Sequence, residues 1–393
     1  MPPRGFRAAA CSSGIKRSGK ADLALIAAER PVACAGLFTT NKVVAAPVLI
    51  TAERVHKGIC QAILVNSGNA NACTGEVGLT DARRCGELAA QALKIETDLV
   101  AVASTGVIGV PLPMSAFEQH VPNLALQLDD GKFLDVARAM MTTDAFEKVC
   151  SRTLKIDNKE CRILGLAKGA GMIHPNMATM LAFVLTDAAI EKKCLESILR
   201  TSVDLSFNRV TVDRDTSTND MTLIMASGLA GNRTLTDNHP DFATFSRALN
   251  DLLLELAKMM VQDGEGATKL VKIQVVGAKT DRQALTVAQT VATSQLVKTA
   301  FFGEDANWGR IIAAVGYSGV EIEPSLIDIQ FDEVPVVTNG VGMGSEVEAK
   351  ATEVMKKAEF TVTIDLHIKD GTGYYYTSDL GYNYVRINAD YRT

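Results

Sequence analysis

The sequence predicts an α/β fold. Apolar, strand-like runs alternate with amphipathic helical stretches from one end of the chain to the other, and no repeat or low-complexity linker interrupts the alternation. The chain has 393 residues and is 47% apolar, which is enough to bury a large core in two or three domains. No Pro/Gly-rich linker separates domains, and we place one boundary near residue 280, after the order of elements changes.

The first half of the chain shows two buried strands around one helix. Residues 61–68 and 99–109 are apolar runs that end in Gly, Ser and Asn turns. Between them, apolar residues recur at helical spacing, namely Leu79, Ala82, Cys85, Leu88, Ala89 and Leu93. Loops after strands often carry functional residues, so both strand ends are candidate positions for a site.

A β-hairpin is predicted around Asp157-Asn158, because this pair favours a tight turn between two strand-like runs. Its second strand leads into a glycine-containing loop over residues 168–177, after which Thr179 begins the next strand. Farther on we expect a helix over 191–205, a strand over 220–227 and a helix over 241–261. After Lys269 the expected order is strand, helix, helix, strand, helix, strand, strand.

Composition argues against nucleic acid or a membrane as partner. The formal net charge is −5 with both signs interspersed, and a single Trp offers no platform for stacked bases. No apolar run approaches the ~20 residues of a membrane span, and the basic N-terminal segment lacks the apolar stretch of a signal peptide. The eight cysteines have neither CxxC nor zinc-finger spacing and indicate buried free thiols. We expect a cytoplasmic protein that acts on a small molecule.

The peptide bond between Ala178 and Thr179 is a candidate cleavage point. Cleavage would give Thr179 a free α-amino group with an unperturbed pKa of about 7.7 to 8, able to act as a base for the threonine hydroxyl. One residue would then supply nucleophile and base. The alternative is a turn built on Gly169, Gly171 and Pro175 that opens a buried strand.

Two groups of hydroxyl-bearing residues are candidate site elements. Thr105 and Gly106 close a buried strand, where a hydroxyl and a backbone N–H can point into one small volume, as an oxyanion hole requires. Thr142 and Asp144 follow a helical segment and offer further polar groups. The alternatives are an ordinary strand-to-loop turn and a solvated helix end.

Two charged side chains lie beside glycines. Lys168 precedes the glycine loop and can pair with a substrate carboxylate as a point charge. Glu265 lies between Gly264 and Gly266, which allow close approach of the backbone, so its carboxylate can meet an amine. For Glu265, a helix end followed by a turn is an equally good interpretation.

Metal and dinucleotide sites lack their usual ligands and spacing. In the acidic stretch from Asp213 to Asp220, Thr218 replaces the glycine of a calcium loop and Ile224 stands where its bidentate Glu belongs. No two histidines have metal-site spacing, and GVGMG at residues 340–344 lacks the strand and helix of a dinucleotide fingerprint. We expect no metal and no cofactor. The segment 302–310 is either a helix capped by Asp305 or Asn307 or a site wall.

Several separated segments together resemble one family, the ornithine acetyltransferases (glutamate N-acetyltransferases) of arginine biosynthesis. The segments are PRGFRAAACSSGIK, LVNSGNANACTG, ASTGVIG, MTTD, KGAGMIHPNMATML, SFNRVTVDRDTSTNDM, DGEGATK, LVKTAFFGEDANWGRI and INADYRT. They occur in the order of the family and span residues 3–393. Because the resemblance starts at Pro3, we expect no cleavable targeting peptide.

The resemblance implies an α/β/β/α sandwich of the self-processing N-terminal-nucleophile kind. Residues 1–178 would form an α chain and residues 179–280 the first part of a β chain, together the catalytic domain. Residues 281–393 would form a smaller α/β domain that contributes the C-terminus to the site. Self-cleavage between Ala178 and Thr179 would produce the two chains, and two cleaved pairs would form a heterotetramer.

The resemblance also implies a reaction and a set of site residues. Thr179 would take the acetyl group from N2-acetyl-L-ornithine and pass it to L-glutamate, and acetyl-CoA is an alternative donor that no residue decides. Thr105 and Gly106 correspond to the oxyanion hole. Substrate binding falls to Thr142, Lys168, Thr179, Glu265, Asn388 and Thr393, although a polar C-terminus such as INADYRT is ordinarily frayed.

Two departures from the family pattern concern local geometry. Ala170 stands where many members have Ser, and Arg214 stands where many have Gly, so Arg214 would be strained if its φ is positive. The alternative functions are a self-processed amidase or aminopeptidase, with water in place of glutamate, and an amino-acid-binding protein that leaves the Ala178-Thr179 bond intact.

Overall fold

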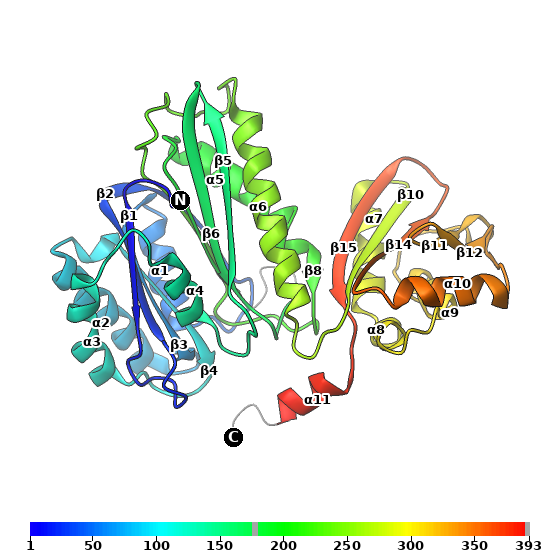
Figure 1. The fold of residues 1–393 in the computed structure, drawn as a ribbon, viewed down its shortest axis with the longest axis horizontal. Coiled ribbons are helices and arrows are strands. Elements are labelled where there is room, and N and C mark those ends of the chain that lie inside the picture. Colours follow the sequence, from blue (N-terminus) through cyan, green and yellow to red (C-terminus); the bar gives the residue numbers. More distant parts are fainter. Residues whose placement is uncertain (175–179, 390–393) are drawn as a thin grey trace. The chain divides into compact units, whose positions relative to one another are not determined.

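The computed structural model describes residues 1–174 and 180–389, and these form two compact units. The first unit comprises residues 1–172, 180–208 and 215–257; the second comprises residues 173–174, 209–214 and 258–389. The last crossing of the chain into the second unit is at Lys258, before the position near 280 at which the sequence indicates a boundary. Each unit is built on its own mixed β-sheet (Figure 1).

The first unit contains an eight-stranded sheet among the described residues, in the order β4-β3-β2-β9-β7-β6-β5, with β1 paired to β2. The pairs β3–β4 and β7–β9 are parallel and the others antiparallel. The strands are β1 (Phe6–Cys11), β2 (Leu23–Phe38), β3 (Ile59–Asn69), β4 (Val100–Val107), β5 (Lys148–Ile156), β6 (Lys159–Lys168), β7 (Leu181–Thr186) and β9 (Met221–Ala226).

Part of this sheet is buried on both faces, which explains the uninterrupted apolar runs in the sequence. In β2, Leu23 and Leu25 join the core under α1, α2 and α3, whereas Ala24 and Ile26 join the core that includes α4. On β6, a Cβ placed on Gly165 would lie 2.6 Å from Leu252 of α6, so the helix and strand pack closely there. The helices are α1 (Ala46–Val55), α2 (Gly75–Leu93), α3 (Met114–Leu126), α4 (Phe133–Met140), α5 (Lys192–Asp204) and α6 (Phe242–Gln262).

The predicted hairpin is confirmed as β5 and β6. Asp157 and Asn158 have φ values of 48° and 60°, the two positive angles that a tight hairpin turn requires. The hairpin places Lys168 at the last position of β6, in register with Leu181 of β7. Lys168 and the start of the strand that follows Thr179 are thus neighbours in the sheet.

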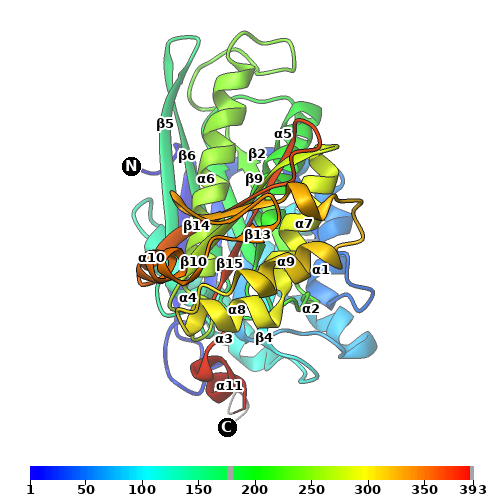
Figure 2. The same ribbon diagram turned by 90° about the vertical axis from the view of Figure 1, so that its right-hand side faces the viewer.

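Within its described residues, the second unit contains a seven-stranded sheet in the order β13-β12-β11-β14-β10-β15-β8. Its strands are β8 (Val210–Thr211), β10 (Leu270–Ala278), β11 (Asp328–Phe331), β12 (Val334–Thr338), β13 (Val341–Gly342), β14 (Glu359–Asp365) and β15 (Gly371–Ser378). One core joins strands β10, β11, β12, β14 and β15 to helices α7 to α10, of which α7, α8 and α9 can be followed in Figure 2. The helices are α7 (Asp281–Thr293), α8 (Gln295–Phe302), α9 (Trp308–Gly316), α10 (Ser345–Met355) and α11 (Tyr382–Ala389).

The α/β class with two sheets confirms the predicted fold class, but the order expected after Lys269 is incomplete. It lacks α9, two of the three strands β11 to β13, and α11. Asn307 caps α9 by accepting the Arg310 N–H at 3.2 Å, as one interpretation of this segment held. The expectation of a frayed terminus is wrong for residues 387–389, which lie in α11, a helix with no buried residue.

Other expectations concern cysteines, backbone strain and membranes. All eight cysteines are free thiols, but the expectation that they are buried is wrong for Cys73, which is exposed, and Cys11 is half-buried. Arg214 has a φ of 71°, the left-handed angle that made a non-glycine residue at this position questionable. No helix in the described part of the chain has the length and apolar character needed to cross a membrane. Short 3-10 helices lie at Thr97–Leu99, Phe207–Arg209 and Pro324–Leu326.

Candidate active site

The neighbouring ends of β3 and β4 place Thr105 and Gly106 in a constrained position. The two strands are parallel, with Thr105 in register with Ser67 and Gly106 with Gly68. Gly106 has a φ of 135°, and a Cβ on it would lie 2.3 Å from the Gly68 carbonyl carbon, so only glycine fits. Thr105 is buried beside it. The predicted oxyanion pair is therefore on rigid backbone at a strand end.

Lys168 joins Thr105 and Thr142, two other residues predicted for the site. Its ammonium is buried, with 3% of the residue exposed, and donates to Thr142 Oγ1 at 2.8 Å and to Thr105 Oγ1 at 3.3 Å. Thr142 reaches this point because α4 ends at Met140 and the chain turns back toward the sheet. The structure thus brings together three predicted residues from three separate segments of the first unit.

Asp144 is the acid of this cluster, and the sequence-based interpretation of its segment as a solvated helix end is wrong. Its side chain is fully buried and accepts the N–H groups of Thr142 at 2.9 Å and Gly169 at 2.6 Å. Lys148 Nζ lies 2.8 Å from Oδ1 and Lys168 Nζ lies 3.7 Å from Oδ2. Burial would raise the pKa of Asp144, but Lys168 and Lys148 hold it well below its usual range.

Lys16 is a further cation close to the cluster, and the sequence analysis did not identify it as a site residue. Its Nζ donates to the carbonyl oxygens of Ala21 at 2.9 Å and Ala139 at 3.3 Å. Burial lowers the pKa of Lys16 to about 8, a shift opposed by Asp22 and increased by the positive charge of Lys168. The only sequence signal for Lys16 is its place at the end of one segment that resembles the family.

The candidate nucleophile Thr179 and its neighbour Ala178 lie outside the described residues. The residue that follows, Met180, donates its N–H to Asp220 Oδ1 at 2.9 Å, and Asp220 is fully buried. Burial raises the pKa of the Asp220 carboxyl well above its usual range, opposed by the Met180 N–H, Ser217 and Lys168. The chain is therefore held firmly one residue beyond Thr179.

Glu265 and Asn388 come together within the second unit. Asn388 Nδ2 donates to Glu265 Oε2 at 2.8 Å and to the Tyr384 carbonyl oxygen at 3.0 Å. The turn after α6 lies against α11, since a Cβ on Gly266 would lie 2.6 Å from the Tyr384 nitrogen. Glu265 is 8% exposed. Thr393, the last residue predicted to bind substrate, lies outside the described residues.

One cluster in the described part of the chain has metal-ligand geometry: Asp157, His239 and Asp241. Its members already bind one another, because His239 Nε2 lies 3.2 Å from Asp157 Oδ2 and Asp241 Oδ2 accepts the Asp157 N–H at 2.8 Å. Arg233 donates to both carboxylate oxygens of Asp157 through its side chain and its backbone N–H. The hydrogen bonds and ion pairs of this group stabilise the β5–β6 turn.

The mixed α/β fold and the cluster of Thr105, Thr142, Asp144 and Lys168 define an enzyme. Residues 7–393 match the model of the ArgJ family, and the chain belongs to that family, which confirms the resemblance seen in its sequence. It is 60% identical over 389 residues to the arginine biosynthesis bifunctional protein ArgJ of Syntrophotalea carbinolica, covering 99% of each chain.

Two solved structures are similar to this chain to different degrees. The crystal structure of the arginine biosynthesis bifunctional protein argJ from Bacillus halodurans is 48% identical with a TM-score of 0.50, over 52% of this chain and 95% of that chain. The ornithine acetyltransferase of Mycobacterium tuberculosis, solved with ornithine, is 37% identical with a TM-score of 0.39, over 46% of this chain and 94% of that chain.

Proposed function

We propose that this chain is an acetyltransferase of arginine biosynthesis that transfers acetyl from N2-acetyl-L-ornithine to L-glutamate. The products would be L-ornithine and N-acetyl-L-glutamate. The observation that carries the proposal is the contact of Lys168 with Thr105 and Thr142, beside the strand that follows Thr179. Membership of the ArgJ family supports it, because the relative at 60% identity is named for arginine biosynthesis.

The first step of the proposed mechanism forms the nucleophile. The Thr179 hydroxyl oxygen attacks the Ala178 carbonyl carbon, the C–N bond breaks and an ester forms, and water then hydrolyses the ester. This leaves a new carboxylate on Ala178 and a free α-amine on Thr179. The hydrogen bond from Met180 to Asp220 and the pairing of Leu181 with Lys168 support this step, because they hold the downstream side of the bond on the sheet.

Turnover then follows a ping-pong cycle. The Thr179 α-amine takes the proton of its own hydroxyl while the oxygen attacks the acetyl carbonyl carbon, and the proton passes to the departing ornithine amine. Thr105 and Gly106 stabilise the oxyanion. The glutamate amine then attacks the carbonyl carbon of acetyl-Thr179, the ester C–O bond breaks, and the amine proton passes through the Thr179 α-amine to the Thr179 oxygen, which restores the hydroxyl. These steps use only side chains and backbone of the protein, and we propose no metal or nucleotide.

The charged residues suit two amino-acid substrates. Lys168 and Thr142 would bind the α-carboxylate that ornithine and glutamate share, since a buried ammonium with neighbouring hydroxyls is a good anion partner. Glu265, Asn388 and Thr393 would bind the remaining polar groups of the substrate. The contact between Asn388 and Glu265 supports their acting as one group.

The mass of the purified protein and its transfer activity test this proposal. We expect two chains, residues 1–178 and 179–393, and a Thr179→Ala variant that stays as one chain and makes no N-acetylglutamate. An uncleaved wild-type protein, or an active Thr179→Ala variant, would rule the mechanism out. Release of acetate without glutamate would instead indicate the amidase alternative.

The relative is named bifunctional, so a second donor belongs in the same assay. We propose acetyl-CoA, which would acetylate Thr179 in place of acetylornithine and leave the second half of the cycle unchanged. Formation of N-acetylglutamate from acetyl-CoA and glutamate, absent in Thr179→Ala, is the measurement. The native mass of the cleaved protein tests the proposed assembly of two cleaved pairs.

A further inference from the structure

Asp144 is a buried carboxylate in the site to which the proposed cycle gives no role. Three hydrogen-bond donors and a second ammonium surround it, because Oδ1 accepts from the Gly169 N–H and from Lys148 Nζ, while Oδ2 accepts the Thr142 N–H and forms an ion pair with Lys168 at 3.7 Å. A carboxylate has enough lone pairs to accept all three hydrogen bonds and still face Lys168. Its position therefore fixes the backbone on both sides of the Lys168 ammonium.

The Lys168 ammonium, which faces Asp144, also contacts the Thr105 hydroxyl. Lys168 Nζ donates to Thr105 Oγ1, so one lone pair of that hydroxyl is already occupied. The Thr105 proton must then point away from Lys168, which leaves it available as a donor. A cation that donates to a hydroxyl also polarises it and strengthens the bond that the hydroxyl donates onward.

We propose that Asp144 is a positioning residue for acetyl transfer, which holds Lys168 against Thr105 and so orients the Thr105 hydroxyl toward the developing oxyanion. The inference rests on the proposed function, which gives Thr105 its place in the oxyanion hole. Lys168 thereby acts on the transition state as well as on the substrate carboxylate. Loss of Asp144 lowers kcat, because the oriented hydroxyl matters most when negative charge develops.

The test is the Asp144→Asn variant. Asparagine keeps the shape of the side chain, but its NH2 group must face either the Thr142 N–H and Lys168 or the Gly169 N–H and Lys148. We expect kcat per cleaved chain to fall about 10-fold to 100-fold, with KM for acetylornithine within about threefold. An unchanged kcat, or a loss confined to KM, overturns the inference.

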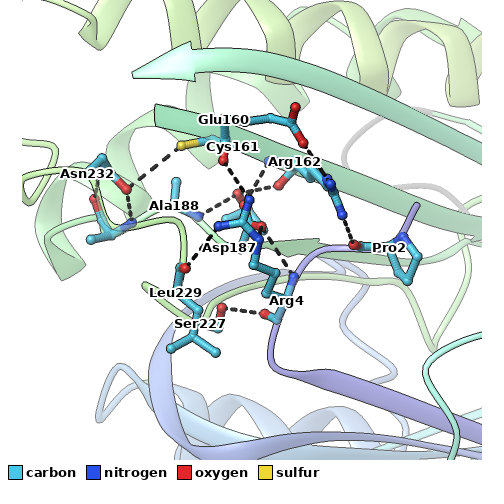
Figure 3. Close-up of polar contacts among 12 residues, drawn as sticks. Pro2, Arg4, Glu160, Cys161, Arg162, Asp187, Ala188, Ser227, Leu229 and Asn232 are labelled. Atoms are coloured by element: carbon cyan, nitrogen blue, oxygen red, sulfur yellow. Dashed lines mark hydrogen bonds and ion pairs between the residues drawn. The ribbon is translucent and has the colours of Figure 1, made fainter. Parts of the chain in front are cut away.

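Asp187→Asn is the matched control. Asp187 is also fully buried and accepts two backbone N–H groups, from Arg162 at 2.7 Å and Arg4 at 3.3 Å, with an ion pair to Arg4 (Figure 3). It lies at the other end of the β6–β7 pair, after Thr186. We expect this variant to keep kcat. A loss equal to that of Asp144→Asn assigns both effects to a weakened fold and overturns the inference.

A second variant separates positioning from folding. Asp144→Asn leaves the fully buried Lys148 without its carboxylate, whereas Asp144→Asn with Lys148→Met removes both charges of that pair. We expect the double variant to regain thermal stability but to keep the low kcat. A recovery of kcat along with stability contradicts a positioning role.

A double-mutant cycle with Thr105→Ala shows whether the effect passes through Thr105. With the hydroxyl removed, we expect Asp144→Asn to lower kcat by less than about threefold further. Full additivity overturns the inference.

The wild-type assay separates this result from the proposed function. If the wild type makes no N-acetylglutamate, that function fails and the inference with it. If the wild type is active, the variants judge Asp144 alone.

Discussion

Asp144 and Asp187 are two buried carboxylates beside the same sheet, and their networks of polar contacts differ. Both side chains are fully buried, and each accepts two backbone N–H groups and faces a cation. They lie at opposite ends of the β6–β7 pair, Asp144 near Lys168 and Asp187 next to Thr186. A buried carboxylate that accepts backbone N–H groups and faces a cation therefore occurs at each end of the β6–β7 pair.

The cations make the difference. Arg4, beside Asp187, is 43% exposed in its side chain and donates its remaining N–H groups to backbone carbonyls of Leu229 and Glu160 (Figure 3). Lys168, beside Asp144, is buried and donates to the hydroxyls of two threonines. A network that ends in backbone carbonyls fastens the N-terminal segment to the sheet. The Lys168 network ends in the hydroxyls of buried Thr105 and half-buried Thr142 and polarises them, and it is this network that we propose serves catalysis.

The largest expected effect is loss of the buried cation. Lys168→Met should lower kcat/KM at least about 100-fold, the scale of removing one oxyanion donor, because it removes the partner of both hydroxyls. Arg4→Met at the other network should leave kcat/KM within about twofold. Initial rates of acetyl transfer at several concentrations of acetylornithine give both numbers. Equal losses would mean that the two networks do not differ in function.

The next largest effect is a loss of stability, and it concerns the network of Asp187 and Arg4. Asp187→Ala leaves the partly buried Arg162 N–H without its acceptor and should lower the free energy of unfolding by about 1 to 3 kcal/mol. Arg4→Met removes a half-exposed ion pair and should cost at most about 1 kcal/mol. Urea unfolding measures both. A cost for Arg4→Met as large as that for Asp187→Ala would show that the ion pair, not the buried acceptor, fastens this segment.

The smallest effect concerns acid. The pKa of Asp144 is lower in the folded protein than the usual value of about 3.9, so its stabilisation is fully present above that pH and is lost as pH falls through the folded value. The double variant Asp144→Asn with Lys148→Met should therefore lose less stability than the wild type between pH 5 and pH 3. Urea unfolding at a series of pH values gives the slopes, and parallel slopes contradict this reading of Asp144.

Local patterns were sufficient to predict much of the first unit. The strands at β3 and β4 and the hairpin turn at Asp157-Asn158 follow from apolar runs and turn chemistry, which act over a few residues. In contrast, α11 was missed because it has no buried face to create a pattern. For a similar reason the sequence left two interpretations of Asp144, a polar group of the site and part of a solvated helix end. Asp144 contacts Gly169, 25 residues away, and nothing in MTTD signals that contact.

By itself, the sequence determined the α/β class, the family, and the candidate residues Thr105, Lys168 and Glu265, because hydrophobic period, turn residues and motifs are properties of short segments. Only the tertiary structure decided that Lys168 contacts Thr105, 63 residues away in the chain, and that Asp144 is buried beside them. Strand pairing determines which residues far apart in the chain come into contact and which charged side chains are buried away from solvent. Spacing along the chain carries neither kind of information, so the chemistry of Asp144 appears only once the sheet has formed.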